Sequence, residues 1–371
     1  MFKAAQLVRA HVHRMAAYEP ILPFEVLSAQ LGLPPERIVK LDANENPYGP
    51  LPVVAQALAE LPYAHIYPDP ECRELRQALA SYHSVPVENL LAGAGADELI
   101  DLIMRLFLEP GDVILNCPPT FGMYAFDAGV NGARVLSVPR RSDFSLDLDA
   151  IEQAVQAERP KLLFLASPNN PDGSLLPPGA LERLLDLPIV VVLDEAYVEF
   201  ALPGASRLRD AAERENLIVL RTFSKWAGLA GLRVGYGVFP GSLMPHLWKI
   251  KQPYNVSVAA ATAAQVSLAH ADQLEQIGRQ IVAERERLWG ALQEIPWLEP
   301  YPSQANFILC RVLGHDAAQL KADLAREGIF IRYFDKPGLR DHIRISVGKP
   351  KHTAALLAKL KRWDADQHSE E

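Results

Sequence analysis

The chain has 371 residues, of which 49% are hydrophobic and 22% charged, a balance typical of folded globular proteins and unlike that of disordered ones. Its length exceeds what one hydrophobic core usually organises and favours two domains, while a formal net charge of −8 disfavours binding to nucleic acid or to an anionic membrane. No apolar run of eighteen residues, secretory signal pattern, disulfide framework or metal-ligand spacing is found, so we expect a cytoplasmic protein whose partners are small molecules.

The middle of the chain alternates short apolar runs with segments long enough to form helices. This alternation predicts an α/β fold with a mostly parallel sheet, because strands that are buried on both faces read as continuous apolar runs. The expected strands are residues 113–117, 135–138, 162–166, 189–193, 217–220 and 234–239. A charged amphipathic stretch over 272–294 predicts a long helix. The remainder predicts a smaller α+β domain, with strands 307–312, 329–333 and 343–347 and helices 317–327 and 353–363.

Two residues that could take part in catalysis or ligand binding, Asp194 and Lys225, follow expected strands. Asp194 comes directly after an apolar run, and ligands of open α/β sheets gather at the carboxyl ends of strands. From its position alone, this carboxylate could bind magnesium, cap a helix or pair with a protonated pyridine nitrogen. Lys225 follows the next expected strand. An isolated lysine is usually a solvated surface residue, but burial beside other cations would make its amine a nucleophile for carbonyls.

Three further segments have both a structural and a functional interpretation. Residues 167–173, Ser-Pro-Asn-Asn-Pro-Asp-Gly, form either a tight turn or a ligand-binding loop. Arg233 suits an anion, although a surface ion pair is the commoner role. Residues 93–98, Gly-Ala-Gly-Ala-Asp-Glu, begin an apolar helix whose free N–H groups would bind a phosphate, or they are simply a helix start. A dinucleotide fingerprint is not indicated, because the third glycine is missing and no solid strand precedes the segment within a clear βαβ unit.

In this order and at these spacings, the segments resemble the fold-type I pyridoxal-phosphate-dependent aminotransferases. The shared features are a phosphate loop, a ring-stacking aromatic residue and the motifs P-N-N-P-x-G, D-E-A-Y, S-K and R-x-G-Y, with 31 residues from Asp194 to Lys225. Within that class the chain looks most like the histidinol-phosphate aminotransferase family, through L-D-A-N-E-N-P-Y-G-P at 41–50, Y-P-D-P at 67–70, C-P-P-T-F-G-M-Y at 117–124, I-R-Y-F at 331–334 and I-R-I-S-V-G at 343–348.

This resemblance covers nearly the whole chain and implies a domain organisation. Residues 1–45 would form an N-terminal arm that packs with the small domain. Residues 46–284 would form the large cofactor-binding domain, whose mostly parallel sheet is flanked by helices. Residues 285–371 would form the smaller α+β domain.

The resemblance also implies a cofactor, pyridoxal 5'-phosphate, and a role for each matching residue. Lys225 would bind the cofactor covalently and move a proton between the substrate carbon and the cofactor. Asp194 would keep the pyridine nitrogen protonated. Tyr197 and Asn170 would hydrogen-bond the phenolic oxygen, and Phe121 would stack on the ring. The residues implied to bind the cofactor phosphate are Ala96, Asp97, Ser224, Arg233 and, from the other subunit of a homodimer with shared sites, Tyr67. The chain departs from the family pattern at Phe121, where tyrosine is common, and at Asp172, where threonine is usual.

Two C-terminal arginines bear on the substrate. The resemblance implies amino transfer between L-histidinol phosphate and 2-oxoglutarate, giving imidazole-acetol phosphate and L-glutamate, in histidine biosynthesis. Arg344 matches the arginine that binds the substrate carboxylate in this class. Histidinol phosphate has no α-carboxylate, so Arg344 would bind its phosphate, helped by Arg332, whose alternative role is a surface pair with Asp335. Tyr18 would line the imidazole pocket.

Other functions on the same fold would share the cofactor residues. An aromatic amino-acid aminotransferase and a threonine-phosphate decarboxylase are the two alternatives, and these residues do not separate them. A transcription regulator with an aminotransferase-like domain would need a DNA-binding segment, and the 40 residues before Leu41 show no clear helix-turn-helix.

Overall fold

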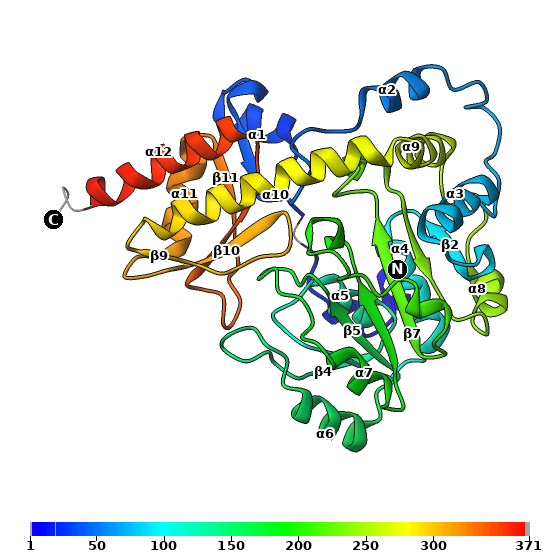
Figure 1. The fold of residues 1–371 in the computed structure, drawn as a ribbon. Coiled ribbons are helices and arrows are strands. Elements are labelled where there is room, and N and C mark those ends of the chain that lie inside the picture. Colours follow the sequence, from blue (N-terminus) through cyan, green and yellow to red (C-terminus); the bar gives the residue numbers. More distant parts are fainter. Residues whose placement is uncertain (1, 19, 368–371) are drawn as a thin grey trace.

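The computed structural model describes residues 2–18 and 20–367. It contains two β-sheets flanked by helices, and Figure 1 shows the larger sheet at the lower right and the smaller one at the left. Met1, Glu19 and residues 368–371, which belong to the predicted arm and small domain, lie outside the described residues.

The larger sheet has seven strands in the order β2-β8-β7-β6-β5-β3-β4. Parallel pairing joins β7, β6, β5, β3 and β4, whereas β8 runs antiparallel to both β7 and β2. This confirms the predicted α/β fold with a mostly parallel sheet. The strands are β2 (Leu90–Gly93), β3 (Val113–Asn116), β4 (Arg134–Ser137), β5 (Leu162–Ala166), β6 (Val190–Asp194), β7 (Leu217–Thr222) and β8 (Gly235–Val238).

Helices cover both faces of this sheet, which explains why its central strands are continuously apolar. In β5, Leu163 and Leu165 contribute to the core on one face, and Leu162 and Phe164 contribute to the core on the other. The first core includes α2 (Pro52–Ala59), α3 (Arg73–His83), α6 (Leu148–Glu158), α7 (Ala180–Leu185) and α9 (Val258–Ala269). The second includes α4 (Ala96–Phe107), α5 (Met123–Val130) and α8 (Met244–Ile250).

The smaller sheet has the order β1-β11-β12-β10-β9. β1 pairs parallel with β11, and the remaining pairs are antiparallel. Its strands are β1 (Val39–Leu41), β9 (Leu298–Pro300), β10 (Phe307–Val312), β11 (Ile329–Tyr333) and β12 (His342–Ser346). Helices α11 (Ala317–Arg326) and α12 (Pro350–Gln367) contribute to its core.

Three short strands were not expected from the sequence. β1 and β9 have three residues each, too few to show a period. β2 has four residues without a β-branched side chain and ends at Gly93. A strand, β2, does therefore precede the Gly-Ala-Gly segment. It pairs with the antiparallel strand β8 and not with β3, the strand that follows α4, so β2, α4 and β3 do not form a βαβ unit of adjacent parallel strands.

The long helix α10 (Ala271–Gln293) connects the two cores, as Figure 1 shows. Leu274 and Ile281 belong to the large core, whereas Leu288 and Leu292 belong to the small one. The predicted boundary between residues 284 and 285 falls between these pairs, and we keep the three predicted domains as a proposal.

The predicted N-terminal arm contacts both parts of the structure. Arg9 donates a hydrogen bond to the carbonyl of Val130 at the end of α5. The chain then forms α1 (Phe24–Leu31) and enters the small sheet as β1. The arm therefore passes from the large sheet to the small one.

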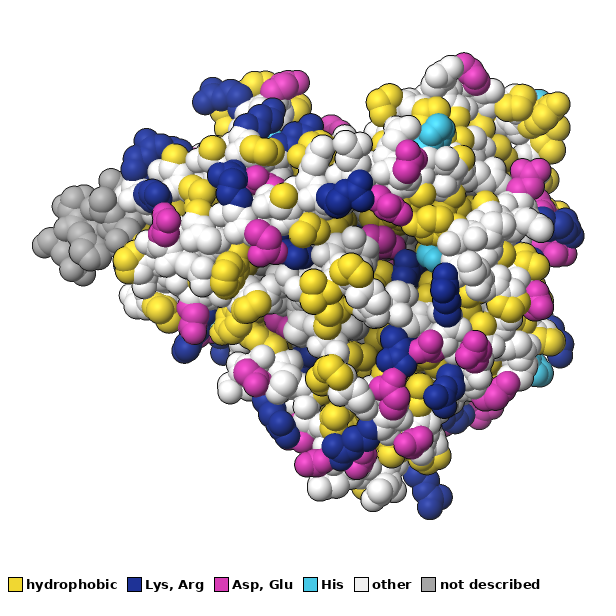
Figure 2. Space-filling view, in the orientation of Figure 1, with side chains coloured by type: hydrophobic (Ala, Val, Ile, Leu, Met, Phe, Trp, Pro, Cys, Tyr) yellow, Lys and Arg dark blue, Asp and Glu magenta, His cyan; other side chains and the backbone are white. Residues whose placement is uncertain are grey.

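Charge of both signs is interspersed over the face shown in Figure 2. Of the described helices, none is long and apolar enough to cross a bilayer.

Candidate active site

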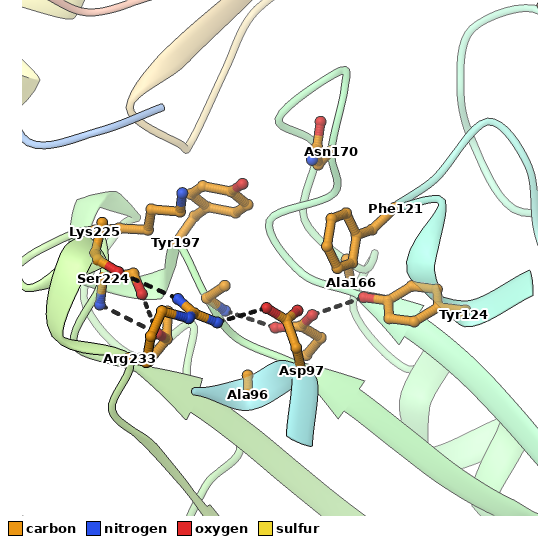
Figure 3. Close-up of a pocket in the computed structure, with 14 residues that line it drawn as sticks. Ala96, Asp97, Phe121, Tyr124, Ala166, Asn170, Tyr197, Ser224, Lys225 and Arg233 are labelled. Atoms are coloured by element: carbon orange, nitrogen blue, oxygen red, sulfur yellow. Dashed lines mark hydrogen bonds and ion pairs between the residues drawn. The ribbon is translucent and has the colours of Figure 1, made fainter. Parts of the chain in front are cut away.

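The carboxyl ends of β5, β6 and β7 and the first turn of α4 surround one pocket (Figure 3). Its lining contains each residue that the sequence predicted for the cofactor, apart from Tyr67. The lining residues are Ala96, Asp97, Phe121, Tyr124, Ala166, Asn170, Asp194, Ala196, Tyr197, Thr222, Ser224, Lys225, Ala230 and Arg233. The resemblance implies no role for two of these polar residues, Tyr124, which ends the motif at 117–124, and Thr222, which ends β7.

Lys225 extends its amine into this pocket, beside the ring of Tyr197 (Figure 3). Its Nζ donates a hydrogen bond of 3.2 Å to the carbonyl oxygen of Ala43 and lies 6.0 Å from the centre of the Tyr197 ring. Burial and, secondly, the positive charge of Arg344 lower the pKa of Lys225 to about 8. A neutral, nucleophilic amine is therefore available near physiological pH.

Asp194 ends β6 and is held by two donors. Its Oδ2 accepts a hydrogen bond of 2.8 Å from the hydroxyl of Tyr124, and its Oδ1 accepts one of 3.0 Å from the backbone N–H of Ala196. Burial raises the pKa of Asp194 to about 6, so the carboxylate is charged at neutral pH and buried without a cationic partner among the residues described. This is a site that favours a protonated base.

A buried ion-pair network joins the ends of the strands that carry Asp194 and Lys225. Arg221, in β7, donates to Glu195 at 3.0 Å and to Glu199 at 3.2 Å, and its third hydrogen bond goes to Ser206. Glu195 directly follows Asp194, and Arg221 lies one residue before Thr222 at the end of β7. The network therefore fixes the two strand ends relative to each other.

The first turn of α4 forms an anion-binding cradle together with Arg233. The N–H groups of a helix's first turn have no partner within the helix, and the helix dipole favours an anion there. A Cβ at Gly95 would lie 2.5 Å from Nη2 of Arg233 and would displace this guanidinium, and the φ of +83° at Gly95 also favours glycine. Arg233 pairs at 2.7 Å with the carboxylate of Asp97, while Ser224 accepts a hydrogen bond from Thr222 in the same pocket.

Arg344 and Arg332 lie directly opposite each other in the antiparallel pair β12 and β11. Both guanidinium groups lie 5.6 Å from the ring of Phe334. Burial and, among the charges, the neighbouring Arg332 lower the pKa of Arg344 to about 10. The carboxylate of Asp335, the alternative partner of Arg332, pairs instead with Arg340 at 2.8 Å.

Arg344 reaches from the small sheet to the loop that follows β5 of the large sheet. It donates to Oδ1 of Asn170 at 2.5 Å and to the carbonyl of Asp42 at 2.7 Å, and its buried Nε has no partner. Asn170 is thus already held toward the pocket by the arginine predicted to bind substrate.

Asp172, the residue that stands in place of threonine, stabilises the loop that presents Asn170. Its carboxylate accepts hydrogen bonds from the side chain of Asn169 and, at 3.0 Å, from the N–H of Ser174. Asn169 in turn donates to the carbonyl of Pro119 at 3.1 Å, and this ties the loop to the segment that carries Phe121.

Tyr67 and Tyr18 lie outside the lining of this pocket. Tyr67 is 80% exposed and stacks on Tyr254 with ring centres 4.7 Å apart. Tyr18 is half exposed and contacts Phe126 of α5 edge-on, with ring centres 6.0 Å apart. The pocket of a single chain therefore forms without either residue.

Among the residues described, no group of three or more His, Cys, Asp or Glu side chains could hold a metal ion. The pocket's donors do fit pyridoxal phosphate. The α4 cradle suits its phosphate, the buried Asp194 carboxylate suits its ring nitrogen, and the Lys225 amine suits its aldehyde.

Comparison with known proteins agrees with this chemistry. Residues 36–360 match the family described as aminotransferase class I and II. The chain is 57% identical over 357 residues to a chloroplastic histidinol-phosphate aminotransferase of Nicotiana tabacum, covering 96% of this chain and 86% of that protein. It is 53% identical to the histidinol-phosphate aminotransferase of Roseiflexus castenholzii, covering 96% and 97%.

A solved structure has the same fold and contains the expected cofactor. The histidinol-phosphate aminotransferase of Sinorhizobium meliloti, in complex with pyridoxal-5'-phosphate, superposes with a TM-score of 0.86 at 30% identity and covers 95% of this chain and 96% of that one. The chain belongs to the class I and II aminotransferases, an enzyme family whose cofactor is pyridoxal phosphate.

Proposed function

We propose that this enzyme transfers an amino group between L-histidinol phosphate and 2-oxoglutarate, giving imidazole-acetol phosphate and L-glutamate, in histidine biosynthesis. The observation that carries this substrate is the pair Arg332 and Arg344, which presents two guanidinium groups from facing positions of β11 and β12. Two such groups suit a doubly charged phosphate better than a single carboxylate. The names of the relatives at 53% and 57% identity agree with this substrate rather than with the aromatic aminotransferase or decarboxylase alternatives.

The chain's own groups supply the proton transfers. When bound, pyridoxal phosphate supplies an electron-accepting ring that stabilises negative charge on a substrate carbon. The Nζ of Lys225 removes the proton from that carbon and returns one during the reaction, a role suited to an amine whose pKa is lowered to about 8. The carboxylate of Asp194 stabilises the protonated ring nitrogen.

The other pocket residues hold the cofactor and substrate in place. Tyr197 and Asn170 hydrogen-bond the phenolic oxygen, and Phe121 stacks on the ring. Arg344 and Arg332 bind the phosphate of histidinol phosphate in one half-reaction. In the other, Arg344 binds the α-carboxylate of glutamate and Arg332 its side-chain carboxylate. Tyr18 lines the imidazole pocket. The groups proposed for the cofactor phosphate are the N–H groups of Ala96 and Asp97, the hydroxyl of Ser224, the guanidinium of Arg233 and Tyr67 from the other subunit.

We also propose a cytoplasmic homodimer with shared sites. Tyr67 is exposed on the surface and does not line the pocket of its own chain, as expected of a residue that contributes to the site of a second copy. The three cysteines are free and buried, which is compatible with a reducing compartment.

The deciding assay compares two amino acceptors. The enzyme loaded with pyridoxal phosphate is given L-glutamate with either imidazole-acetol phosphate or phenylpyruvate, and kcat/KM is measured for each. A higher value for imidazole-acetol phosphate supports the proposal. A higher value for phenylpyruvate replaces it with the aromatic aminotransferase.

A further inference from the structure

Asn44 is a buried residue of the segment between β1 and α2, and the resemblance to the family implies no role for it. We propose that Asn44 is a positioning residue that makes the Tyr197 hydroxyl a hydrogen-bond donor into the pocket. The inference rests on the proposed role of Tyr197 toward the cofactor. It does not depend on which amino compound is the substrate.

Asn44 joins three parts of the chain at one point. Its Nδ2 donates to the hydroxyl oxygen of Tyr197 at 3.1 Å, and its Oδ1 accepts from the hydroxyl of Ser346 at 2.8 Å. Its carbonyl accepts from the side chain of Asn306 at 3.0 Å. Asn44 is 1% exposed, so water does not compete for these contacts. Ser346 lies in β12, and Tyr197 follows β6.

The direction of each hydrogen bond follows from the one before it. The backbone N–H of Asn44 donates to Oγ of Ser346 at 2.9 Å, and a backbone N–H is always a donor. The hydroxyl proton of Ser346 has no acceptor among the described residues other than the Asn44 side chain. Because Ser346 is buried, this proton is satisfied only when the amide oxygen of Asn44 faces it, whereas the opposite orientation of the amide would leave the proton without a partner. The other end of that amide is then the NH₂ group, which can only donate to Tyr197.

The Tyr197 hydroxyl is thus an acceptor toward Asn44 and has its own proton left to give. Among the described residues no other hydrogen bond to this hydroxyl occurs. Burial raises the pKa of Tyr197 above its ordinary value, so the proton stays on the oxygen. Tyr197 lines the pocket beside Lys225 (Figure 3), and the pocket is where a new acceptor would bind. The phenolic oxygen of the cofactor is an acceptor of this kind.

The backbone next to Asn44 also contacts the small sheet and the pocket. The preceding carbonyls, of Asp42 and Ala43, accept from Arg344 and Lys225 respectively. Asn44 has a φ of +55°, a left-handed conformation that asparagine, aspartate and glycine tolerate better than other residues. Its substitution by glycine or aspartate therefore keeps the backbone path while changing the side-chain hydrogen bond.

The test is a pH titration of the visible absorbance of enzyme loaded with pyridoxal phosphate, without substrate. The proton that titrates lies between the Lys225 nitrogen and the phenolic oxygen of the cofactor. When the phenolic oxygen loses a hydrogen-bond donor, this proton is bound more tightly, so the midpoint of the absorbance titration moves to higher pH. Asn44→Asp replaces the donor with an acceptor that takes the Tyr197 proton, and should raise the midpoint by roughly one pH unit. Asn44→Gly removes the donor to the Tyr197 hydroxyl, and Ser346→Ala removes the group that orients this donor. Neither variant adds an acceptor for the Tyr197 proton, so both should raise the midpoint less.

Two controls separate this role from general destabilisation. Asn89 is another buried asparagine, whose Nδ2 donates to the carbonyl of Phe239 at 2.7 Å away from the pocket lining. Asn89→Ala should lower Tm without moving the midpoint. In a Tyr197→Phe background, Asn44→Gly should cause no further shift, because the hydroxyl that it positions is gone.

The proposal is overturned if Asn44→Gly titrates like Asn89→Ala, or if its shift persists in the Tyr197→Phe background. Should Asn44→Gly fail to fold, Ser346→Ala alone decides by the same two comparisons. A shifted midpoint in an enzyme that prefers phenylpyruvate would reject the proposed substrate and leave the role of Asn44 intact.

Discussion

At the scale of single residues, Lys225 has the environment of a reactive amine. It is buried, its amine donates to the carbonyl of Ala43, and the positive charge of Arg344 opposes its protonation more than that of Arg233 does. Burial and like charge act in the same direction on the pKa. Asp194 shows the opposite case, because burial raises the pKa of its carboxyl while Tyr124 and Ala196 stabilise the charged form.

Removal of the Lys225 amine should remove the visible absorbance of the enzyme. Lys225→Ala leaves the α4 cradle and Asp194 in place, so cofactor can still bind non-covalently while the covalent link and the proton transfer are lost. We expect the purified wild type to be yellow. The variant should lose that absorbance, or keep only the absorbance of non-covalently held cofactor, and should lose turnover. Spectra and steady-state rates measure both effects. Full activity in Lys225→Ala would contradict the mechanism.

The lowered pKa of Lys225 predicts how cofactor uptake depends on pH. Only the neutral amine attacks the aldehyde, so the rate of uptake by the cofactor-free protein should rise with pH and level off above about 8. A solvated lysine would give a rate that continues to rise toward pH 10. Stopped-flow absorbance after mixing with pyridoxal phosphate measures this profile. A plateau only near pH 10 would show an unperturbed amine.

At the scale of elements, the strand pair β11 and β12 presents the two arginines that we propose to bind the anionic groups of the substrates. Arg332 and Arg344 occupy partner positions in this pair, and Phe334 lies beside both guanidinium groups. Of the two, only Arg344 is buried and hydrogen-bonded to Asn170, in the loop that follows β5. Arg332 makes no hydrogen bond or ion pair with any described residue and is free for a second anion.

This difference predicts separable effects of the two arginines. A charge-assisted hydrogen bond is worth about 1.5–3 kcal/mol, so Arg332→Leu should lower kcat/KM for histidinol phosphate by roughly one to two orders of magnitude. Glutamate should lose activity too, whereas unphosphorylated aromatic amino acids should be spared. Arg344→Leu should impair every substrate.

The matched control is Arg311→Leu, because Arg311 lies in the neighbouring strand β10 and pairs with Asp341 at the surface. This variant should keep full activity. An unchanged kcat/KM for histidinol phosphate in Arg332→Leu would remove the argument for the substrate.

At the scale of the whole molecule, the segment between α2 and α3 carries an exposed apolar surface. Tyr63, Ile66 and Tyr67 are each more than half exposed, and Tyr254 is nearly so. Hydrophobic side chains gather over this segment at the upper right of Figure 2. Such patches are typical of contact surfaces between proteins, and a second copy of the chain would cover this one.

A complementation experiment tests the shared site. Tyr67→Ala and Lys225→Ala chains should each form inactive dimers, whereas a mixed dimer would contain one site with both residues intact. The two inactive proteins are mixed, and heterodimers are verified by differential tags. Each heterodimer should recover up to about half of the activity of a wild-type dimer, because one of its two sites is intact. Verified heterodimers without activity would show that Tyr67 does not act across subunits.

Much of the architecture could be predicted from local pattern. The strands that carry Asp194 and Lys225 were predicted because strands buried on both faces are continuously apolar, and the polar residues that follow them mark the edge of the sheet where ligands bind. The roles of these residues, and the bounds of the three domains, stay predictions. β1 and β9 were not predicted because three residues are too few for a periodic signal, and β2 was not predicted because it has no β-branched side chain and ends at a glycine.

Contacts between distant segments could not be predicted in this way. Asn44 and Ser346 are separated by 302 residues, and Tyr124 and Asp194 by 70, yet each pair forms one hydrogen-bonded unit. Arg332 and Arg344 were expected to bind one phosphate together, and it is the register of β11 and β12 that places them opposite each other. The periodicity of hydrophobic residues and the residue preferences of turns depend on near neighbours in the sequence, so they can be recognised from the sequence. The approach of remote polar groups depends on how the two sheets and α10 pack, which no local pattern encodes.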